Sequence, residues 1–283
     1  MSYRGRLAPS PNGNLHLGHA RSFHIAYERA IERGGSIVLR IEDLDPGRCK
    51  PEFVQAIYDD FHWLGLQWEG EPMFQSKRRE AYVSAWKQLR DGGYIYPCLR
   101  TRKDLRTAAS APHAEDEGAE PIYPPAWRPP PGSGQDRLEP AGSNWRFRVP
   151  DGEAVCFHDD LRGPQRFVAG TDFGDFLVWR RDDAASYELA VVVDDIDQEI
   201  SEVVRGEDLL RSTARQILVY RALGAEPPAW AHLKLVVGDD GRRLAKRHGS
   251  LSLQALREAG RDPVECLAIA NSATTFGPGG REE

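Results

Sequence analysis

The sequence predicts an α/β fold with a parallel sheet, because strand-like and helix-like segments alternate from its amino end. The segment 4–8 is predicted to be a short strand and is followed by a turn rich in Pro, and residues 15–32 then show helical spacing of apolar side chains. Residues 36–41 form a β-branched apolar run that is typical of a buried strand. A strand, a helix and a strand in this order predict the βαβ unit of a parallel sheet.

Later segments extend this pattern along the chain. Helical spacing predicts helices at 51–64, 77–90, 209–223, 252–259 and 263–270. Strand character predicts strands at 94–98, 145–149, 166–169, 176–179, 187–193, 199–204 and 232–237. Between them, residues 111–142 contain eight Pro and four Gly, a composition that favours neither a helix nor a central strand. We therefore expect an irregular insertion there.

The composition excludes several classes of protein. The 283 residues are 40% hydrophobic and 28% charged, which is ordinary for a globular chain with a sizeable core. No apolar run is long enough to span a membrane and the amino end has no secretory signal, so we expect a cytoplasmic protein. The four cysteines are far apart in sequence, which favours reduced thiols over disulfides. A net charge of −6 gives no general affinity for nucleic acid, although a local groove can still be basic.

A first motif lies where the expected first strand enters the first helix. His16 and His19 are three residues apart, which places both imidazoles on one face of the helix start. The helix N-terminus offers unpaired N–H groups, and Gly18 allows a ligand to approach the backbone. Parallel sheets bind ligands at the carboxyl ends of their strands, so these residues predict a nucleotide-phosphate site. The alternative is that the two histidines only cap the helix.

A second motif is basic and lies near the carboxyl end. Residues 242–250 read Arg-Arg-Leu-Ala-Lys-Arg-His-Gly-Ser and separate an expected strand and turn from a helix. Lys246 could close on a polyphosphate from such a loop, and His248 beside it could also reach a phosphate. Taken alone, the segment is better explained as a solvated basic loop.

Together the two motifs resemble the His-Ile-Gly-His and Lys-Met-Ser-Lys-Ser motifs that bind ATP in class I aminoacyl-tRNA synthetases. Further segments resemble the glutamate-specific branch of that class, namely 6–11, 40–46, 187–195 and 204–209. The similarity runs from about residue 4 to 263. The short stretch after the second motif resembles the truncated glutamyl-queuosine tRNA(Asp) synthetases.

The resemblance implies a class I synthetase architecture: a Rossmann-like parallel sheet, an inserted acceptor-binding subdomain and a short helical C-terminal segment. The first half of the catalytic domain would span residues 1–97 and the second half 186–238. The insertion would occupy 98–185, and the Lys246 loop with the C-terminal helices 239–283.

The resemblance also implies an activity. The chain would activate L-glutamate with ATP and Mg²⁺ and transfer it to the queuosine base in the anticodon loop of tRNA(Asp). No protein residue is assigned to the Mg²⁺. The catalytic, ATP-binding residues would be His16, His19 and Lys246, with Gly18 in the ATP site. In the glutamate site, Arg6 and Arg205 would bind the carboxylates and Glu42 would bind the ammonium group. Tyr187 and Ser10 would each add a hydroxyl group.

The sequence departs from the family in two places. Family members hold zinc in the insertion with a Cys-x-Cys pair, a Tyr and a later Cys. Here Cys98 and Tyr123 match, whereas Arg100 and Trp127 stand where two cysteines are expected. One thiolate and one phenol do not make a structural zinc site, so we expect no zinc. In the second motif, Arg243 and Ala245 replace the usual first lysine and serine, so we expect activation to persist in weakened form.

Two alternatives to this activity remain open from the sequence. The chain could pass glutamate to an acceptor other than tRNA, or it could be a non-catalytic binding module, and we expect a monomer in either case. Asp43 and Asp45 can be explained by a turn before a proline. The pair Asp194 and Asp195 would end a strand and Asp208 would begin a helix, so capping explains them without catalysis.

Overall fold

We describe the protein from a computed structural model. The structure describes residues 2–101, 104–105, 121–236 and 252–272. Its strands are β1 (Arg4–Leu7), β2 (Ser36–Ile41), β3 (Met73–Phe74), β4 (Ile95–Cys98), β5 (Asn144–Phe147), β6 (Ala154–Asp159), β7 (Gly163–Val168), β8 (Phe176–Arg180), β9 (Ala184–Ala185), β10 (Glu202–Gly206) and β11 (Ala229–Leu233). Its α-helices are α1 (Leu17–Glu32), α2 (Pro51–Trp63), α3 (Arg79–Asp91), α5 (Tyr187–Asp197), α6 (Leu210–Ala222), α7 (Leu253–Glu258) and α8 (Pro263–Ser272). Short 3-10 helices are η1 (Gln75–Lys77), η2 (Pro125–Trp127) and η3 (Glu207–Leu209).

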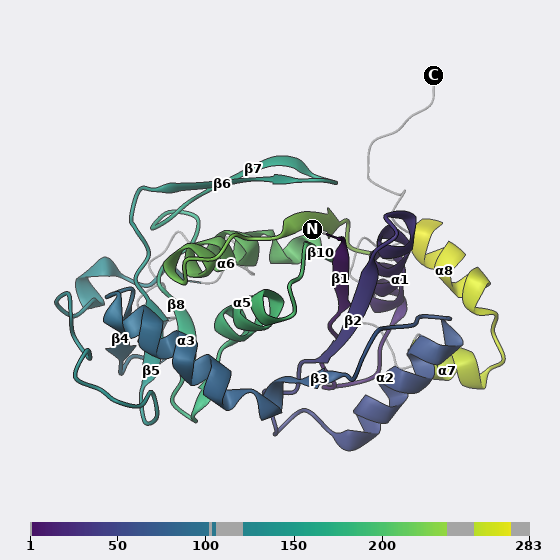
Figure 1. The fold of residues 1–283 in the computed structure, drawn as a ribbon, viewed down its shortest axis with the longest axis horizontal. Coiled ribbons are helices and arrows are strands. Elements are labelled where there is room, and N and C mark those ends of the chain that lie inside the picture. Colours follow the sequence, from purple (N-terminus) through teal and green to yellow (C-terminus); the bar gives the residue numbers. More distant parts are fainter. Residues whose placement is uncertain (1, 102–103, 106–120, 237–251, 273–283) are drawn as a thin grey trace.

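The predicted βαβ unit and parallel sheet are confirmed. β1 pairs with β2 in parallel, with Arg6 opposite Val38, and β2 pairs with β3 in parallel. β10 and β11 form a second parallel pair, which β6 extends. β1 runs beside β10 (Figure 1), where the Ser201 N–H donates to the Arg4 carbonyl oxygen at 2.9 Å. The carboxyl ends of four parallel strands, β1, β2, β10 and β11, are thereby brought to one side.

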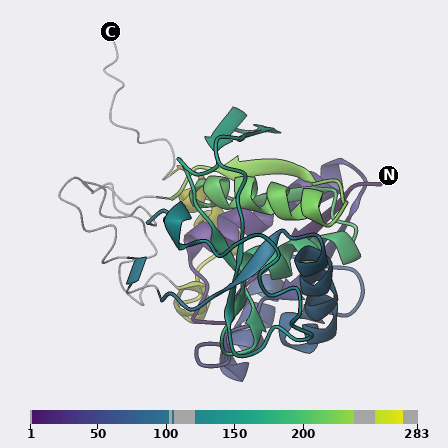
Figure 2. The same cartoon turned by 90° about the vertical axis from the view of Figure 1, so that its left-hand side faces the viewer.

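The insertion contributes strands to two different sheets. β4, β5, β8 and β9 form an antiparallel sheet, which Figures 1 and 2 place at the end of the molecule away from α7 and α8. The hairpin β6–β7 pairs instead with β11 and projects over α6 (Figure 1). The insertion is therefore joined to the parallel sheet as well as to its own sheet, and the boundaries given above remain a prediction.

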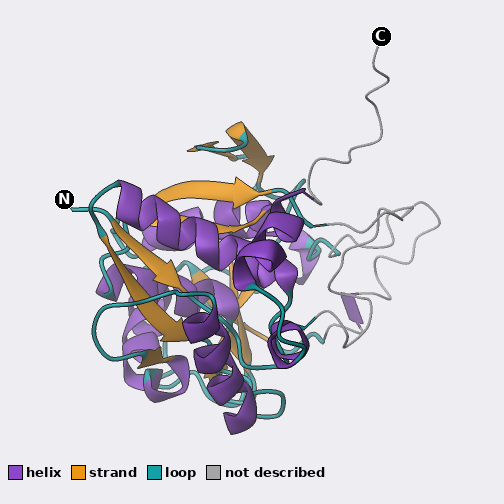
Figure 3. Cartoon of the chain, turned by 90° about the vertical axis from the view of Figure 1, so that its right-hand side faces the viewer, coloured by secondary structure: helices purple, strands orange, loops and turns teal. Residues whose placement is uncertain are grey.

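The helices cover the parallel strands. α1 packs against β1, β2 and β10, α8 packs on the outside of α1, and α7 packs against α2. In the view of Figure 3, these helices lie in front of most of the strands. No helix among the described residues is both long and apolar enough to cross a bilayer. All four cysteines are described and none forms a disulfide.

The prediction of a strand at 187–193 is wrong. This segment forms the first two turns of α5, which begins after Ser186. The cause is burial on every side: Leu189 to Val193 are all buried, so the apolar run has no polar face to show a helical period. Tertiary packing here outweighs the β preference of the three valines.

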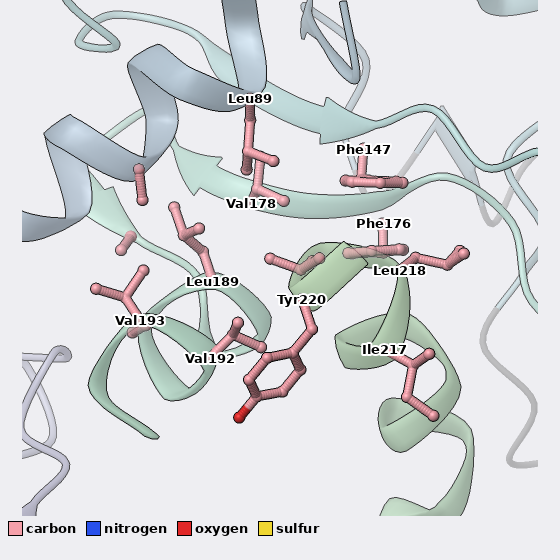
Figure 4. Packing of buried hydrophobic residues seen from close by; sticks show 14 of the residues in the cluster. Leu89, Phe147, Phe176, Val178, Leu189, Val192, Val193, Ile217, Leu218 and Tyr220 are labelled. Atoms are coloured by element: carbon pink, nitrogen blue, oxygen red, sulfur yellow. The ribbon is translucent and has the colours of Figure 1, made fainter. Parts of the chain in front are cut away.

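The larger hydrophobic core lies between α3, α5, α6 and the insertion sheet (Figure 4). Leu189 and Val192 of α5 point into it from one side, and Leu218 of α6 enters from another. Phe147 and Phe176 stack with their ring centroids 5.1 Å apart. A second core lies between α1, α2 and the first parallel strands. The two cores fix α5 and α6 beside the carboxyl ends of the parallel strands.

Candidate active site

A pocket of about 530 Å³ opens at the carboxyl ends of β1, β2, β10 and β11. This is the side on which open parallel sheets bind ligands. It brings together eight of the nine predicted site residues, namely Arg6, Ser10, His16, Gly18, His19, Glu42, Tyr187 and Arg205.

The ninth predicted residue, Lys246, lies outside the described residues, as does His248. The residues that flank this segment do reach the pocket. Val236 lines it on one side. On the other side, Ser252 forms a β-bridge with His16, and the Leu253 N–H donates to the Leu15 carbonyl oxygen at 2.8 Å. The described residues on both sides of the segment that contains Lys246 thus lie at or beside this pocket.

The two histidines cap α1 and face the pocket at the same time. The Nδ1 atom of His16 accepts the Gly18 N–H at 3.1 Å, and the Nδ1 atom of His19 accepts the His16 N–H at 3.3 Å. Because both Nδ1 atoms accept, the proton of each neutral imidazole is on Nε2. Capping and ligand binding are therefore compatible: the backbone uses one nitrogen of each ring and leaves an N–H donor on the other.

The same two rings stack on each other with centroids 3.7 Å apart. Burial lowers the pKa of His16 and of His19, and the neighbouring His16 lowers that of His19 further. Both rings are therefore neutral at pH 7 and can donate without adding a charge. A Cβ atom on Gly18 would lie 3.1 Å from Cε1 of His16, so a side chain there would push this ring aside. Glycine at this position therefore leaves room for the His16 ring as well as for the approach of a ligand.

Arg6 is held by a buried cluster of charges below the pocket. Its Nε atom lies 2.9 Å from Oδ1 of Asp195, and the same oxygen accepts a hydrogen bond from Arg40 at 2.7 Å. Arg40, which is fully buried, also lies 3.4 Å from Glu42. Burial raises the pKa of Glu42, and Arg40 and Arg6 oppose this shift. Glu42 is therefore a largely buried carboxyl group that lies beside Arg40 and lines the pocket.

The interpretation of Asp194 and Asp195 as strand-end residues is wrong. Both lie in α5 and both are buried. Asp194 accepts hydrogen bonds from the side chains of Gln75 and Tyr82, each at 2.8 Å, and pairs with Arg78 at 3.1 Å. The sequence signal was available: two acidic residues directly after a fully apolar run predict buried carboxylates that need cationic partners.

Arg205 is held at the other side of the pocket by neutral groups. Its NH2 atom donates to Thr213 at 2.7 Å and to Gln216 at 2.9 Å, and its NH1 atom donates to the Tyr187 hydroxyl at 3.3 Å. Its Nε atom donates to Nε2 of His232 at 3.1 Å, and the guanidinium lies over the ring of Trp230. None of these contacts is with a carboxylate. The sequence analysis missed His232 because a single histidine in an apolar strand gives no signal by itself.

Two other sequence interpretations have clear outcomes. Asp45 shapes a turn, as expected, since its side chain accepts the Gly47 N–H at 3.2 Å and pairs with Arg48 at 2.7 Å. Asp43 instead accepts two hydrogen bonds from Ser76, at 2.6 and 2.8 Å.

The residues expected to be remnants of a zinc site, Cys98 and Tyr123, are packed in a buried cluster with Trp127. The Cys98 sulfur and the Tyr123 hydroxyl lie 3.3 Å apart and are buried, and the Trp127 ring packs edge-on against Tyr123. The Arg100 guanidinium lies 4.8 Å above the Trp127 ring. Among the described residues, no three His, Cys, Asp or Glu side chains are grouped so that they could hold a metal ion. One thiol and one phenol do not fit the four-ligand zinc site of the family.

Comparison with known proteins decides the family. The family described as tRNA synthetases class I (E and Q), catalytic domain, matches residues 2–277. The chain belongs to this family. The class I synthetase fold predicted from the sequence is thereby confirmed.

Two relatives within these class I synthetases are named glutamyl-Q tRNA(Asp) synthetase. That of Nitratidesulfovibrio vulgaris is 46% identical over 96% of this chain and 93% of its own length. That of Rhodopirellula baltica is 44% identical over 96% of this chain and 85% of its own length. A solved glutamate tRNA ligase from Elizabethkingia meningosepticum, in complex with its amino acid, aligns with a TM-score of 0.71 and 27% identity. That alignment covers 92% of this chain but 53% of the ligase, so this chain spans about half of its length.

Proposed function

We propose that this protein activates L-glutamate with ATP and transfers it to the queuosine base in the anticodon loop of tRNA(Asp). The observation on which this rests is the pocket itself, where two arginines and a carboxylate lie beside two imidazole N–H donors. The family and the names of the relatives at 44–46% identity support the same activity.

In the first step, an oxygen of the glutamate α-carboxylate attacks the α-phosphorus of ATP. The new O–P bond gives glutamyl-adenylate, and the bond to the bridging oxygen breaks to release pyrophosphate. The carboxylate is already ionised at pH 7, so no general base is required. The Nε2–H groups of His16 and His19 donate to phosphate oxygens, and Lys246 neutralises the departing pyrophosphate. When bound, Mg²⁺ would neutralise part of the polyphosphate charge, and no residue is assigned to it.

Charge complementarity selects the amino acid. Arg6 and Arg205 bind its carboxylates, Glu42 binds its ammonium group, and Ser10 and Tyr187 add hydroxyl contacts. Arg205 has no carboxylate partner among its contacts in the described part of the chain, so it retains a full positive charge for the ligand. A neutral glutamine side chain would leave this buried charge unpaired, which is a strong basis for rejection.

The alternative is an acceptor other than tRNA, and it is favoured by the insertion, which differs from the family where acceptor contacts would lie. Arg100 and Trp127 occupy two positions at which the family has cysteines. Under this alternative, the same glutamyl-adenylate would pass its glutamyl group to a carrier protein or a small amine.

The test is glutamate-dependent ATP–pyrophosphate exchange, measured with glutamate, glutamine and aspartate. We expect exchange with glutamate only. Labelled glutamate is then incubated with ATP and tRNA that contains or lacks queuosine, and we expect label only on the first. Exchange without transfer to either tRNA would favour another acceptor, and no exchange at any Mg²⁺ concentration would favour a binding module.

A companion prediction concerns the residue outside the described part of the chain. Replacing Lys246 with alanine should lower the exchange rate by well over tenfold, roughly the effect of losing one charged contact to the transition state. The exposed Lys87 provides a control for loss of a lysine elsewhere. An unchanged rate in Lys246→Ala would remove this residue from the mechanism.

A further inference from the structure

Arg205 is joined through His232 to a carboxylate on a different part of the chain. Nε of Arg205 donates to Nε2 of His232 at 3.1 Å, and Nδ1 of His232 lies 2.5 Å from Oδ2 of Asp159. Asp159 and His232 are fully buried, and Arg205 is nearly so. The three residues come from β6, β11 and β10, so the line of contacts runs from the insertion hairpin to the pocket.

These contacts permit one protonation state of the imidazole. The guanidinium Nε always carries a hydrogen and can only donate, so Nε2 of His232 must be without a hydrogen. The Thr213 hydroxyl lies 3.0 Å from the same Nε2 atom and can donate to it as well. The single proton of the neutral ring is then on Nδ1 and faces the Asp159 carboxylate, which accepts it. A doubly protonated ring would direct an N–H against that of Arg205.

Asp159 is itself fixed by the backbone. Its Oδ1 atom accepts the N–H groups of Leu161 at 3.1 Å and Arg162 at 2.9 Å, both in the β6–β7 turn. The His232 N–H also lies 3.2 Å from Oδ1 and 3.1 Å from Oδ2. The orientation of this carboxylate is therefore set by the turn, and Oδ2 is the oxygen that remains for the imidazole.

We propose that Asp159 and His232 are positioning residues for Arg205. Asp159 keeps the imidazole in the Nδ1–H tautomer, and the bare Nε2 atom then orients the guanidinium toward the amino acid. This inference rests on the proposed function, in which Arg205 binds a carboxylate of glutamate. It assigns a role to the β6–β7 hairpin, since the turn of that hairpin fixes the carboxylate.

The decisive variant is Asp159→Asn. The asparagine oxygen would keep the backbone N–H groups of the turn, so its NH₂ group would replace Oδ2 and face His232. That donor forces the opposite tautomer and places an Nε2–H against Arg205. We expect the KM for glutamate in the exchange assay to rise about tenfold or more, as for a lost hydrogen bond to a charged group. The KM for ATP should stay within about twofold, because His16 and His19 are untouched.

A second variant separates the tautomer from packing. In His232→Gln, the side-chain oxygen can replace Nε2 as the acceptor for Arg205, so the KM for glutamate should stay within a few-fold of the wild-type value. The Gln amide directs its oxygen to Arg205 only while its NH₂ group donates to Asp159, so Asp159→Asn should raise the KM in this background too. In His232→Leu, which has neither a donor nor an acceptor, the KM should already be raised and Asp159→Asn should add almost nothing. If Asp159→Asn raises the KM equally in the wild type and in His232→Leu, Asp159 acts only through structure and the proposal is wrong.

A matched control lies next to Asp159 in the same turn. Asp160 is 53% exposed and pairs with Arg29 at the surface. Asp160→Asn removes one negative charge from the same turn and should leave the KM for glutamate unchanged. A rise in this variant equal to that in Asp159→Asn would attribute the effect to the charge of the turn.

A spectroscopic reading tests the pair without activity. The ¹⁵N chemical shifts of His232 report which ring nitrogen is protonated. Its signals are identified among those of the eight histidines because they disappear in His232→Gln. We expect Nδ1–H in the wild type and Nε2–H in Asp159→Asn. An Nε2–H ring in the wild type overturns the proposal. Absence of glutamate-dependent exchange in a wild type with the expected tautomer would instead contradict the proposed function.

Discussion

The pocket and the Cys98 cluster differ in the side chains that they contain. The pocket is lined by charged groups that have buried charged partners, whereas the Cys98 cluster consists of neutral side chains. In the pocket, Arg6 lies against the buried carboxylate of Asp195, and Glu42 lies against the buried guanidinium of Arg40. In the insertion, Cys98 and Tyr123 lie beside Trp127, and the described residues there do not supply the set of ligands that a metal needs. Removing one member of a charged set leaves an uncompensated buried charge, whereas removing one member of a neutral cluster leaves a small cavity.

The two arginines of the pocket differ in whether a protein carboxylate balances their charge. Arg6 shares Asp195 with Arg40, so a protein carboxylate already balances part of its charge. Among the described residues, the hydrogen bonds of Arg205 go to neutral groups, including Thr213 and Gln216, and the Glu188 carboxylate acts on it only through space. We infer that Arg205 provides most of the preference for a negatively charged substrate and that Arg6 provides mainly geometry.

The largest expected effect is therefore at Arg205. Arg205→Ala should lower kcat/KM for glutamate in the exchange assay by roughly a thousandfold, as expected when a buried charge partner is lost. It should also reduce the preference for glutamate over glutamine, because the charge that rejects the amide is gone. Arg221→Ala, which removes an exposed arginine at the end of α6, is the control. A preference that survives Arg205→Ala would move the discrimination to Arg6.

The next effect concerns the stability of the cluster below Arg6. Asp195→Asn leaves Arg6 and Arg40 without their shared anion while the shape of the side chain is preserved. We expect the free energy of unfolding, measured with urea, to fall by about 3 kcal/mol or more. Asp197→Asn, which removes a partly exposed carboxylate from the end of the same helix, should cost far less. Equal losses in the two variants would mean that the buried charges contribute nothing beyond the surface pair.

A pH effect distinguishes the two sides of the pocket. Burial lowers the pKa of His232 to about 4, assisted by Arg205 and Arg162 and opposed by Asp159. A folded-state pKa below the unfolded value means that the unfolded chain binds the proton first. Stability should therefore fall as the pH drops from about 6.5 to about 4, by up to roughly 3 kcal/mol from this residue, and should then level off.

His232→Gln removes that titration and provides the measurement. Urea unfolding of the variant and of the wild type across this pH range should show a shallower acid loss in the variant. The same slope in both proteins would mean that His232 is not buried in its neutral form. Asp195 and the Arg6 side of the pocket are unchanged in this comparison, so the difference between the proteins reports the Arg205 side alone.

Local patterns in the sequence predicted the frame of the molecule but not the partners of its charges. The strand Ser36–Ile41 and the helix at 51–64 follow from apolar spacing that neighbouring residues reveal, and both are found. The apolar run at 187–193 predicts a strand but forms α5, because its apolar residues are buried on all sides and show no helical period. Asp159 and His232 are 73 positions apart, and only the pairing of β6 with β11 brings them together. The types of residue in the pocket were thus predictable, whereas the groups that orient them depend on tertiary structure.

The smallest effect is expected in the Cys98 cluster, and it tests the neutral side of the first comparison. Cys98→Ala removes a buried thiol that contacts Tyr123, so we expect a loss of about 1 kcal/mol in unfolding free energy from the cavity. The exchange rate with glutamate should be unchanged, since the cluster is separate from the residues that line the pocket. Cys156→Ala, at an exposed cysteine, controls for loss of a thiol and should change neither quantity. Metal analysis of the purified wild type should find no stoichiometric zinc. Zinc that is present in the wild type and absent from Cys98→Ala would show that further ligands complete a metal site. The loss of unfolding free energy in Cys98→Ala would then be the large loss expected for removal of a metal, and not the small loss expected for a cavity.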